Sequence, residues 1–149
     1  MANLKIGDST LLTTDGVEVL FLPLKGHIDV YTSPKLKGKL IDYAGEGKFS
    51  IILDLKDVEF LDASPLGIMV GGLKRLKCHN GMLGIVGTHE KLLKIFQITG
   101  LIKVFPFWEI VDGVVTEGNA SEGAFNSLLS SILQRAAVLK CVQKYANQD

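Results

Sequence analysis

The sequence has few of the residues that build metal or redox centres. Its 149 residues include only two cysteines, Cys78 and Cys141, whose separation matches no metal-ligand spacing. In a reducing cytosol we expect both to be free thiols, with a redox pair as the alternative if the fold brings them together. Neither His79 nor His89 has a carboxylate or a cysteine at ligand spacing. The sequence therefore predicts no metal site and no cofactor.

An excess of charge and a long apolar run are missing as well. Lys+Arg and Asp+Glu number 16 each, so the formal net charge is zero. A nucleic-acid-binding surface needs a basic excess, which argues against a nucleic-acid partner. No apolar run approaches the ~18 residues of a membrane span, and the first residues lack the apolar core of a signal peptide. We expect a cytoplasmic protein without membrane contact.

Catalytic signatures are also absent. The chain contains no Gly-x-x-x-x-Gly-Lys-Ser/Thr phosphate loop and no Gly-x-Ser-x-Gly nucleophile elbow. No stretch combines a nucleophile, a base and an oxyanion site, so we expect no enzyme. The length suits one domain, and 47% hydrophobic residues can supply a sizeable core.

The clearest local pattern lies in residues 50–77. Ser50–Leu55 is an apolar run typical of a buried strand, and a helical face with spacings of three and four begins at Leu66. In the turn between them, Asp62 or Ser64 can cap the helix, and Pro65 suits its first turn. This helix start would attract negative charge. On this pattern alone, the simpler interpretation is that the two polar residues are helix caps and nothing more, since capping residues are common.

The rest of the chain alternates strands and helices. Asp15-Gly16 indicates a hairpin turn, and Pro23 suggests an edge or a bulge in the strand that follows it. The other strands that we expect are an edge strand 4–13 and strands 17–24, 82–86 and 102–107. The other helices that we expect are 33–45, capped by Ser33, 89–100, capped by Thr88, and one that starts within 108–116. The alternation predicts an α/β fold with a mostly parallel central sheet and an N-terminal β-hairpin.

A separate pattern occupies the tail. After a flexible break at 116–121, the spacing of Phe125, Leu129, Ile132, Ala136 and Leu139 predicts a long amphipathic helix capped by Ser121. Its apolar face either packs back on the domain or binds a second copy or a partner. We place the domain at residues 8–116 and a C-terminal extension at 117–149.

Four segments carry a resemblance to a known family. The stretch 58–70, which reads VEFLDASPLGIMV, resembles the signature of STAS-domain anti-sigma factor antagonists, in which the turn usually reads Asp-Ser-Ser-Gly-Leu-Gly or Asp-Ser-Thr-Gly-Leu-Gly. Segments 26–36, 71–77 and 93–106 are similar to the family in the same order. The resemblance covers residues 8–116, is closest to the actinobacterial BldG-like group, and implies the STAS fold.

The resemblance also implies a function. It implies a cytoplasmic regulator of transcription that binds a serine-kinase-type anti-sigma factor and frees a sigma factor by partner switching. The implied docking surface, here called the rim, consists of Asp29, Asp62, Ala63, Ser64, Pro65, Leu66 and Gly67. The alternative is a STAS scaffold or sensor module in a multiprotein signalling assembly, with self-association through the C-terminal helix.

The chain departs from the family at the phosphorylation position. In the family the serine directly after the aspartate accepts the phosphate, and that position here is Ala63, which has no hydroxyl. Either the protein is never phosphorylated and binds constitutively, or Ser64 has become the acceptor. Pro65 restricts the backbone of Ser64, and phosphoryl transfer needs near-attack geometry. We therefore favour the constitutive version.

Overall fold

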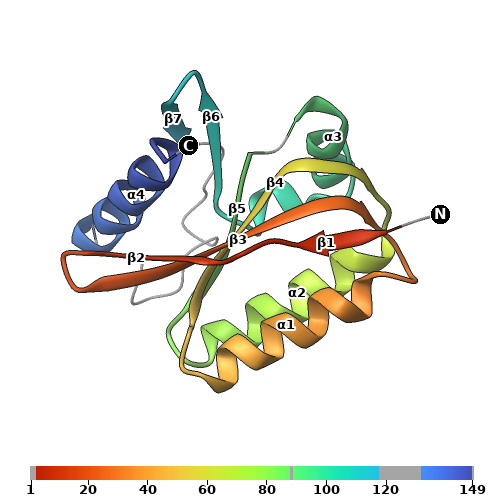
Figure 1. The fold of residues 1–149 in the computed structure, drawn as a ribbon, viewed down its shortest axis with the longest axis horizontal. Coiled ribbons are helices and arrows are strands. Elements are labelled where there is room, and N and C mark those ends of the chain that lie inside the picture. The colour runs from red at the N-terminus through yellow and green to blue at the C-terminus, as the bar shows by residue number, and fades with distance from the viewer. Residues whose placement is uncertain (1–2, 88, 118–131, 149) are drawn as a thin grey trace.

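The computed structural model describes residues 3–87, 89–117 and 132–148, in which helices lie on both faces of a seven-stranded sheet (Figure 1). The strand order is β1-β3-β4-β5-β6-β7, and β2 pairs with β3 beside β1. The strands are β1 (Leu4–Ile6), β2 (Thr10–Thr14), β3 (Val17–Ile28), β4 (Ser50–Leu61), β5 (Met82–Val86), β6 (Phe107–Val111) and β7 (Val114–Glu117). The helical elements are α1 (Ser33–Gly45), α2 (Ser64–Lys77), α3 (Glu90–Ile98), the 3-10 turn η1 (Leu101–Lys103) and α4 (Ile132–Ala146). Among these described helices, none is long and apolar enough to cross a membrane.

The centre of the sheet is parallel, as the sequence predicts. Strands β3, β4, β5 and β6 run in one direction, while β1, β2 and β7 are antiparallel to their neighbours. The ladder between β3 and β4 shifts register after Pro23, so the predicted bulge is confirmed. Strand β3 lies inside the sheet because β1 and β2 pair with its other side.

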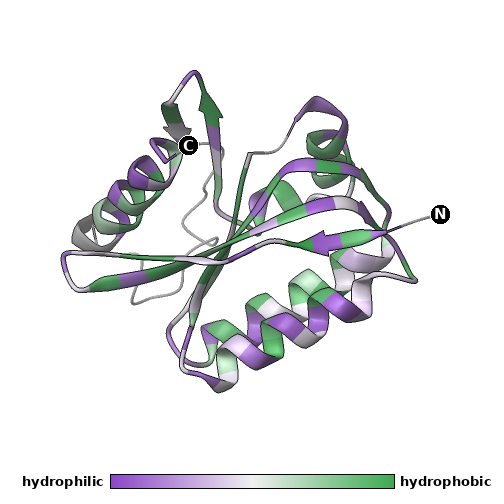
Figure 2. Cartoon of the chain, viewed as in Figure 1, coloured by the Kyte–Doolittle hydropathy of each residue, from purple (hydrophilic) through white to green (hydrophobic). Residues whose placement is uncertain are grey.

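Helices α1 and α2 cover one face of the sheet. Leu22, Leu53 and Ile85 on this face are completely buried, and Leu36 of α1 and Met69 of α2 pack over the same cluster. Figure 2 shows the hydrophobic residues concentrated on the central strands. Helix α3 adds Leu92 and Phe96 to this cluster through Phe105 and Phe107. The N-cap predicted for α3, Thr88, lies outside the described residues.

Helix α4 covers the opposite face. Its buried residues Val138, Cys141 and Val142 form a second cluster with Val19, Phe21, Ile52, Met82, Val86 and Trp108. Of the two alternatives for the tail, the described part therefore packs back on the domain. The predicted packing face was wrong, because Ala136 and Leu139 are exposed and the buried stripe runs through small residues. Ser121, Phe125 and Leu129 lie outside the described residues.

The segment after α3 differs from the prediction. Residues 101–103 form η1, and the last parallel strand begins only at Phe107. The helix predicted to start within 108–116 is wrong, because β6 and β7 form a hairpin there. Asp112 and Gly113 both have positive φ, at 50° and 77°, which is the conformation of a two-residue hairpin turn. The turn predicted at Asp15-Gly16 has the same conformation and is confirmed.

The two cysteines lie in different layers. Cys78 is exposed directly after α2, and Cys141 is buried under α4 on the other side of the sheet. Both are free thiols, as expected from the sequence. The redox-pair alternative is wrong because the sheet separates the two side chains.

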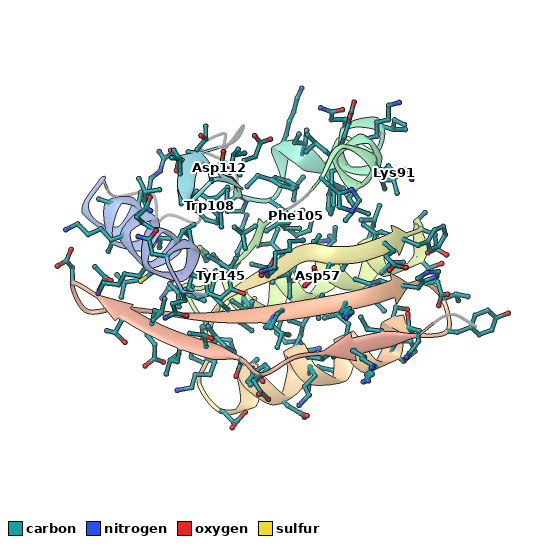
Figure 3. All side chains as sticks on the ribbon, turned by 45° about the horizontal axis from the view of Figure 1, so that its top comes forward. Asp57, Lys91, Phe105, Trp108, Asp112 and Tyr145 are labelled. Carbon is teal, nitrogen blue, oxygen red and sulfur yellow. The ribbon has the colours of Figure 1, made fainter. Side chains whose placement is uncertain are left out.

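A buried carboxylate ties α4 to the sheet. Asp54, at 4% exposure, accepts the hydroxyl of Tyr145 on Oδ2 at 2.6 Å and the backbone N–H of Lys56 on Oδ1 at 3.1 Å. The Tyr145 ring also stacks on Phe21, with centroids 4.3 Å apart. Figure 3 shows Tyr145 at the end of α4, next to the sheet. Burial raises the pKa of Tyr145, and the hydrogen bond and charge of Asp54, followed by the charge of Asp57, raise it further.

We expect Tyr145→Phe to lower the free energy of unfolding by about 1–3 kcal/mol, because the variant leaves one oxygen of a buried carboxylate without its donor. The raised pKa of Tyr145 stabilises the fold below the ordinary tyrosine pKa of about 10, and this contribution falls as the pH rises above that value. Urea unfolding across this pH range measures both effects.

The control is Tyr43→Phe, since Tyr43 is half-buried on α1 and packs against the other cluster. We expect the gap in unfolding free energy between the wild type and Tyr145→Phe to narrow above about pH 10. A gap that stays constant across the whole pH range would contradict the assigned hydrogen bond.

Candidate functional site

The ends of β3 and β4 bring the two halves of the rim together. Ile28 pairs with Leu61 as the last pair of the parallel ladder, and Asp29 and Asp62 follow directly. The N–H of Asp62 donates to the carbonyl of Ile28 at 3.3 Å, so the two turns are joined. The carboxyl ends of parallel strands are where open α/β sheets present their functional turns.

Asp29 organises the first turn. Its Oδ1 accepts the N–H of Tyr31 at 2.9 Å and the N–H of Thr32 at 3.0 Å. The hydroxyl of Thr32 donates to the carbonyl of His27 and accepts the N–H of Asp29. Asp29 therefore caps the backbone donors of its own turn. Ser33, predicted as the N-cap, is instead the buried first residue of α1, and Thr32 takes the N-cap position.

Asp62 organises the second turn. Its Oδ1 accepts the N–H of Ser64 at 3.0 Å. Ser64 is the first residue of α2, and the N-cap position is held by Ala63, whose side chain cannot accept a hydrogen bond. Of the two capping candidates, Asp62 therefore receives the backbone donor. Both Ala63 and Ser64 are exposed, which leaves the Ser64 hydroxyl on the surface.

The rim has an outer and an inner layer. Ala63, Ser64 and Gly67 are exposed, and Asp62 is half-buried. The remaining members, Asp29, Pro65 and Leu66, are buried and support the surface from below. Within the described chain there is no group of three or more His, Cys, Asp or Glu side chains that could hold a metal ion.

Three exposed apolar side chains that the sequence patterns did not indicate lie beside the rim. Val30, Tyr31 and Phe60 are 55%, 86% and 45% exposed. Val30 and Tyr31 lie in the turn that Asp29 holds, and Phe60 pairs with His27 two residues before Asp62. For Val30 and Tyr31 the sequence does contain a signal, because two apolar residues follow the capping residue Asp29 in a turn. Large exposed aromatic residues are frequent anchors of protein interfaces.

The family of the chain follows from a comparison of its sequence with models of known protein families. The model of the STAS domain family matches residues 10–114. The chain belongs to the STAS family. The predicted family and fold are thereby confirmed, whereas the BldG-like subgroup and the domain boundaries of 8–116 and 117–149 stay predictions. The matched region ends before α4.

Named relatives of this STAS chain are anti-sigma factor antagonists. It is 40% identical over 78 residues to the anti-sigma-B factor antagonist of Bacillus subtilis, covering 52% of this chain and 71% of that protein. It is 32% identical over 107 residues to the corresponding antagonist of Listeria monocytogenes, covering 72% and 90%. The crystal structure of an anti-sigma factor antagonist from Mycobacterium paratuberculosis matches with a TM-score of 0.58 and 26% identity, covering 70% of this chain and 85% of that one.

We expect Asp29→Ala to lower the free energy of unfolding by about 1–3 kcal/mol, because two backbone N–H groups in a part-buried turn lose their acceptor. Asp29→Asn keeps an acceptor oxygen and should be milder. Urea unfolding measures both variants.

The matched control is Asp62→Ala in the neighbouring turn. Its single exposed hydrogen bond to Ser64 should be worth only about 0.5–1.5 kcal/mol. Equal effects of the alanine substitutions at both positions would show that Asp29 does not hold its turn as described.

Proposed function

We propose that this STAS protein is an anti-sigma factor antagonist that docks through the rim on a serine-kinase-type anti-sigma factor in the cytoplasm and thereby frees a sigma factor. The observation that supports it most directly is the exposed Ala63-Ser64 turn at the start of α2, in a chain whose relatives carry the name of anti-sigma-B factor antagonists. The joined ends of β3 and β4 hold this turn in place.

The surface beside the turn is suited to protein docking. Tyr31 and Phe60 offer apolar area that can be desolvated, and Asp62 and Glu59 place carboxylates beside it. Such a combination of aromatic anchors within a charged surround is typical of binding energy concentrated in a few residues. Charged neighbours add partner choice and association rate more than affinity.

We further propose that docking is constitutive. Ala63 offers no oxygen for phosphoryl transfer. The N–H of Ser64 is held by Asp62 at 3.0 Å, so a phosphate on Ser64 would add about −1.5 to −2 charges beside that carboxylate. Repulsion of this kind and the restriction by Pro65 both oppose a switch displaced to Ser64. The exposure of Ser64 is the observation on which the displaced-switch alternative rests.

The scaffold alternative loses part of its support. It depended on an apolar tail helix in need of a partner, and in the described residues Val138, Cys141 and Val142 of α4 are buried against the chain's own sheet. Ala136 and Leu139 of the predicted face stay exposed.

We expect the wild-type protein to stay unphosphorylated when incubated with its anti-sigma kinase and ATP, because Ala63 has no hydroxyl. The variant Ala63→Ser should acquire one phosphate, detected by mass spectrometry of the peptide that contains Asp62. Phosphate on Ser64 of the wild type would overturn the constitutive version and establish the displaced switch. Ala63→Ser combined with Ser64→Ala identifies the acceptor.

We expect Tyr31→Ala and Phe60→Ala each to weaken binding to the anti-sigma factor at least about tenfold, as aromatic anchors do. Isothermal titration calorimetry with the kinase recovered by pull-down from the native extract measures the loss.

The control is Val114→Ala, since Val114 is 63% exposed on the edge strand β7 at the far side of the sheet order. Its affinity should match the wild type. Unchanged affinity for both aromatic variants would place the interface elsewhere. Recovery of STAS proteins alone, without a kinase, would favour the scaffold role.

A further inference from the structure

A hollow lies between α1 and α2, which run side by side on one face of the sheet (Figure 1). Its volume is about 260 Å³, and residues of these two helices alone line it. Leu40, Ile41, Ile68 and Leu76 supply its apolar surface. We call this hollow the α1–α2 groove. It lies outside the turn of Ala63 and Ser64, although Gly67 belongs to both the groove and the rim.

Glycines keep the groove open. A Cβ on Gly72 would lie 3.1 Å from Cδ1 of Leu40, so close packing of the two helices explains that glycine. A Cβ on Gly67 or Gly71 would meet nothing within 4 Å. Glycine inside a helix is roughly 0.5–1 kcal/mol less favourable than alanine. Helix packing requires a glycine at neither Gly67 nor Gly71. What the absence of side chains at these two positions does provide is the open volume of the groove.

The charge on the groove has one sign. Lys37 of α1 and Arg75 of α2 line it, and no acidic side chain does. Other lysines of α1 are engaged, since Lys35 donates to the carbonyl of Leu4 and Lys39 lies over the Tyr43 ring. Among the described residues, neither Lys37 nor Arg75 has a hydrogen bond or an ion pair. The groove thus combines an apolar floor with two uncompensated cations.

We propose that the α1–α2 groove binds a small amphiphilic carboxylate, with its apolar chain along the floor and its carboxylate on Arg75 or Lys37. Arginine binds a carboxylate through two parallel N–H donors, which fits one anionic end. At about 260 Å³ the groove lies just below the range of ligand sites, which begins at about 300 Å³, so it suits a single small molecule. A partner helix with its side chains is about 10 Å across and would need more room. This assignment does not depend on the anti-sigma factor proposal.

The test titrates the intact ¹⁵N-labelled protein with sodium octanoate and follows the amide resonances of α1 and α2 by NMR. We expect saturable shifts with a Kd on the order of 1 mM for a ligand of this size. Each methylene removed from the chain should weaken binding about fourfold. Octylamine should bind at least tenfold more weakly than octanoate. The double variant Arg75→Gln, Lys37→Gln should weaken the binding of octanoate to a similar degree.

A matched pair of variants locates the site. Gly71→Leu fills the groove and should abolish the shifts. Gly38→Leu is the control, since Gly38 lies exposed on α1, lines no part of the groove and likewise has nothing within 4 Å of an added Cβ. Both variants replace a helical glycine by a better helix former, so both should fold, which circular dichroism verifies.

Three outcomes would overturn the proposal. Equal binding of octylamine would mean that the cations do not select the ligand. Octanoate shifts that survive Gly71→Leu would place the ligand elsewhere. No response to octanoate, with α1 and α2 responding only to the anti-sigma factor, would make the groove a protein contact. Because the titration uses this protein alone, its failure leaves the proposed antagonist function untouched.

Discussion

The parallel pairing of β3 with β4 is the constraint on which the other elements depend. Both strands are buried on both faces: Phe21 and Ile52 point to the α4 side, and their neighbours Leu22 and Leu53 point to the α1 and α2 side. A slip of one residue would exchange these faces, so the register is strongly specified. The same register ends both strands at one level, which places the turns of Asp29 and Asp62 together. The rim is thus a consequence of how the core pairs.

A hydrogen bond to a buried carboxylate of the sheet holds α4 in place. Asp54 belongs to the central ladder, yet one of its oxygens is satisfied by Tyr145 from the last helix. A buried charge is tolerated only where hydrogen bonds compensate for its lost hydration. The apolar contacts of Val138 and Val142 and this polar contact therefore act on the same face, and they fix both the position and the rotation of α4. This rotation of α4 about its axis turns Val138 and Val142 toward the sheet and leaves the predicted packing residues Ala136 and Leu139 exposed.

The sequence predicted the features that neighbouring residues determine and missed those that depend on long-range packing. The strand at β4, the helix at α2 and the turn at Asp62 follow from a buried run, a helical period and a capping group, and each was found. The predicted strand ended at Leu55, however, whereas β4 continues through Lys56 and Asp57 to Leu61. The β6–β7 hairpin was missed although Asp112-Gly113 repeats the signal of Asp15-Gly16, because the flanking strands are short and Val111 and Val114 are exposed. The exposure of Phe60 and the open space at Gly71 depend on how distant segments approach each other, which no local pattern encodes.

The contacts of α4 have a consequence for how the chain is made. Tyr145 is 91 residues from Asp54, and Lys140 is 125 residues from its ion-pair partner Asp15. Synthesis proceeds from the N-terminus, and contacts of large sequence separation form late. The face that holds Phe21, Ile52 and Trp108 therefore lacks its α4 cover until the ribosome has synthesised α4 and released it from the exit tunnel. A ribosome that stops before α4 releases a chain whose sheet exposes this whole apolar face to aggregation.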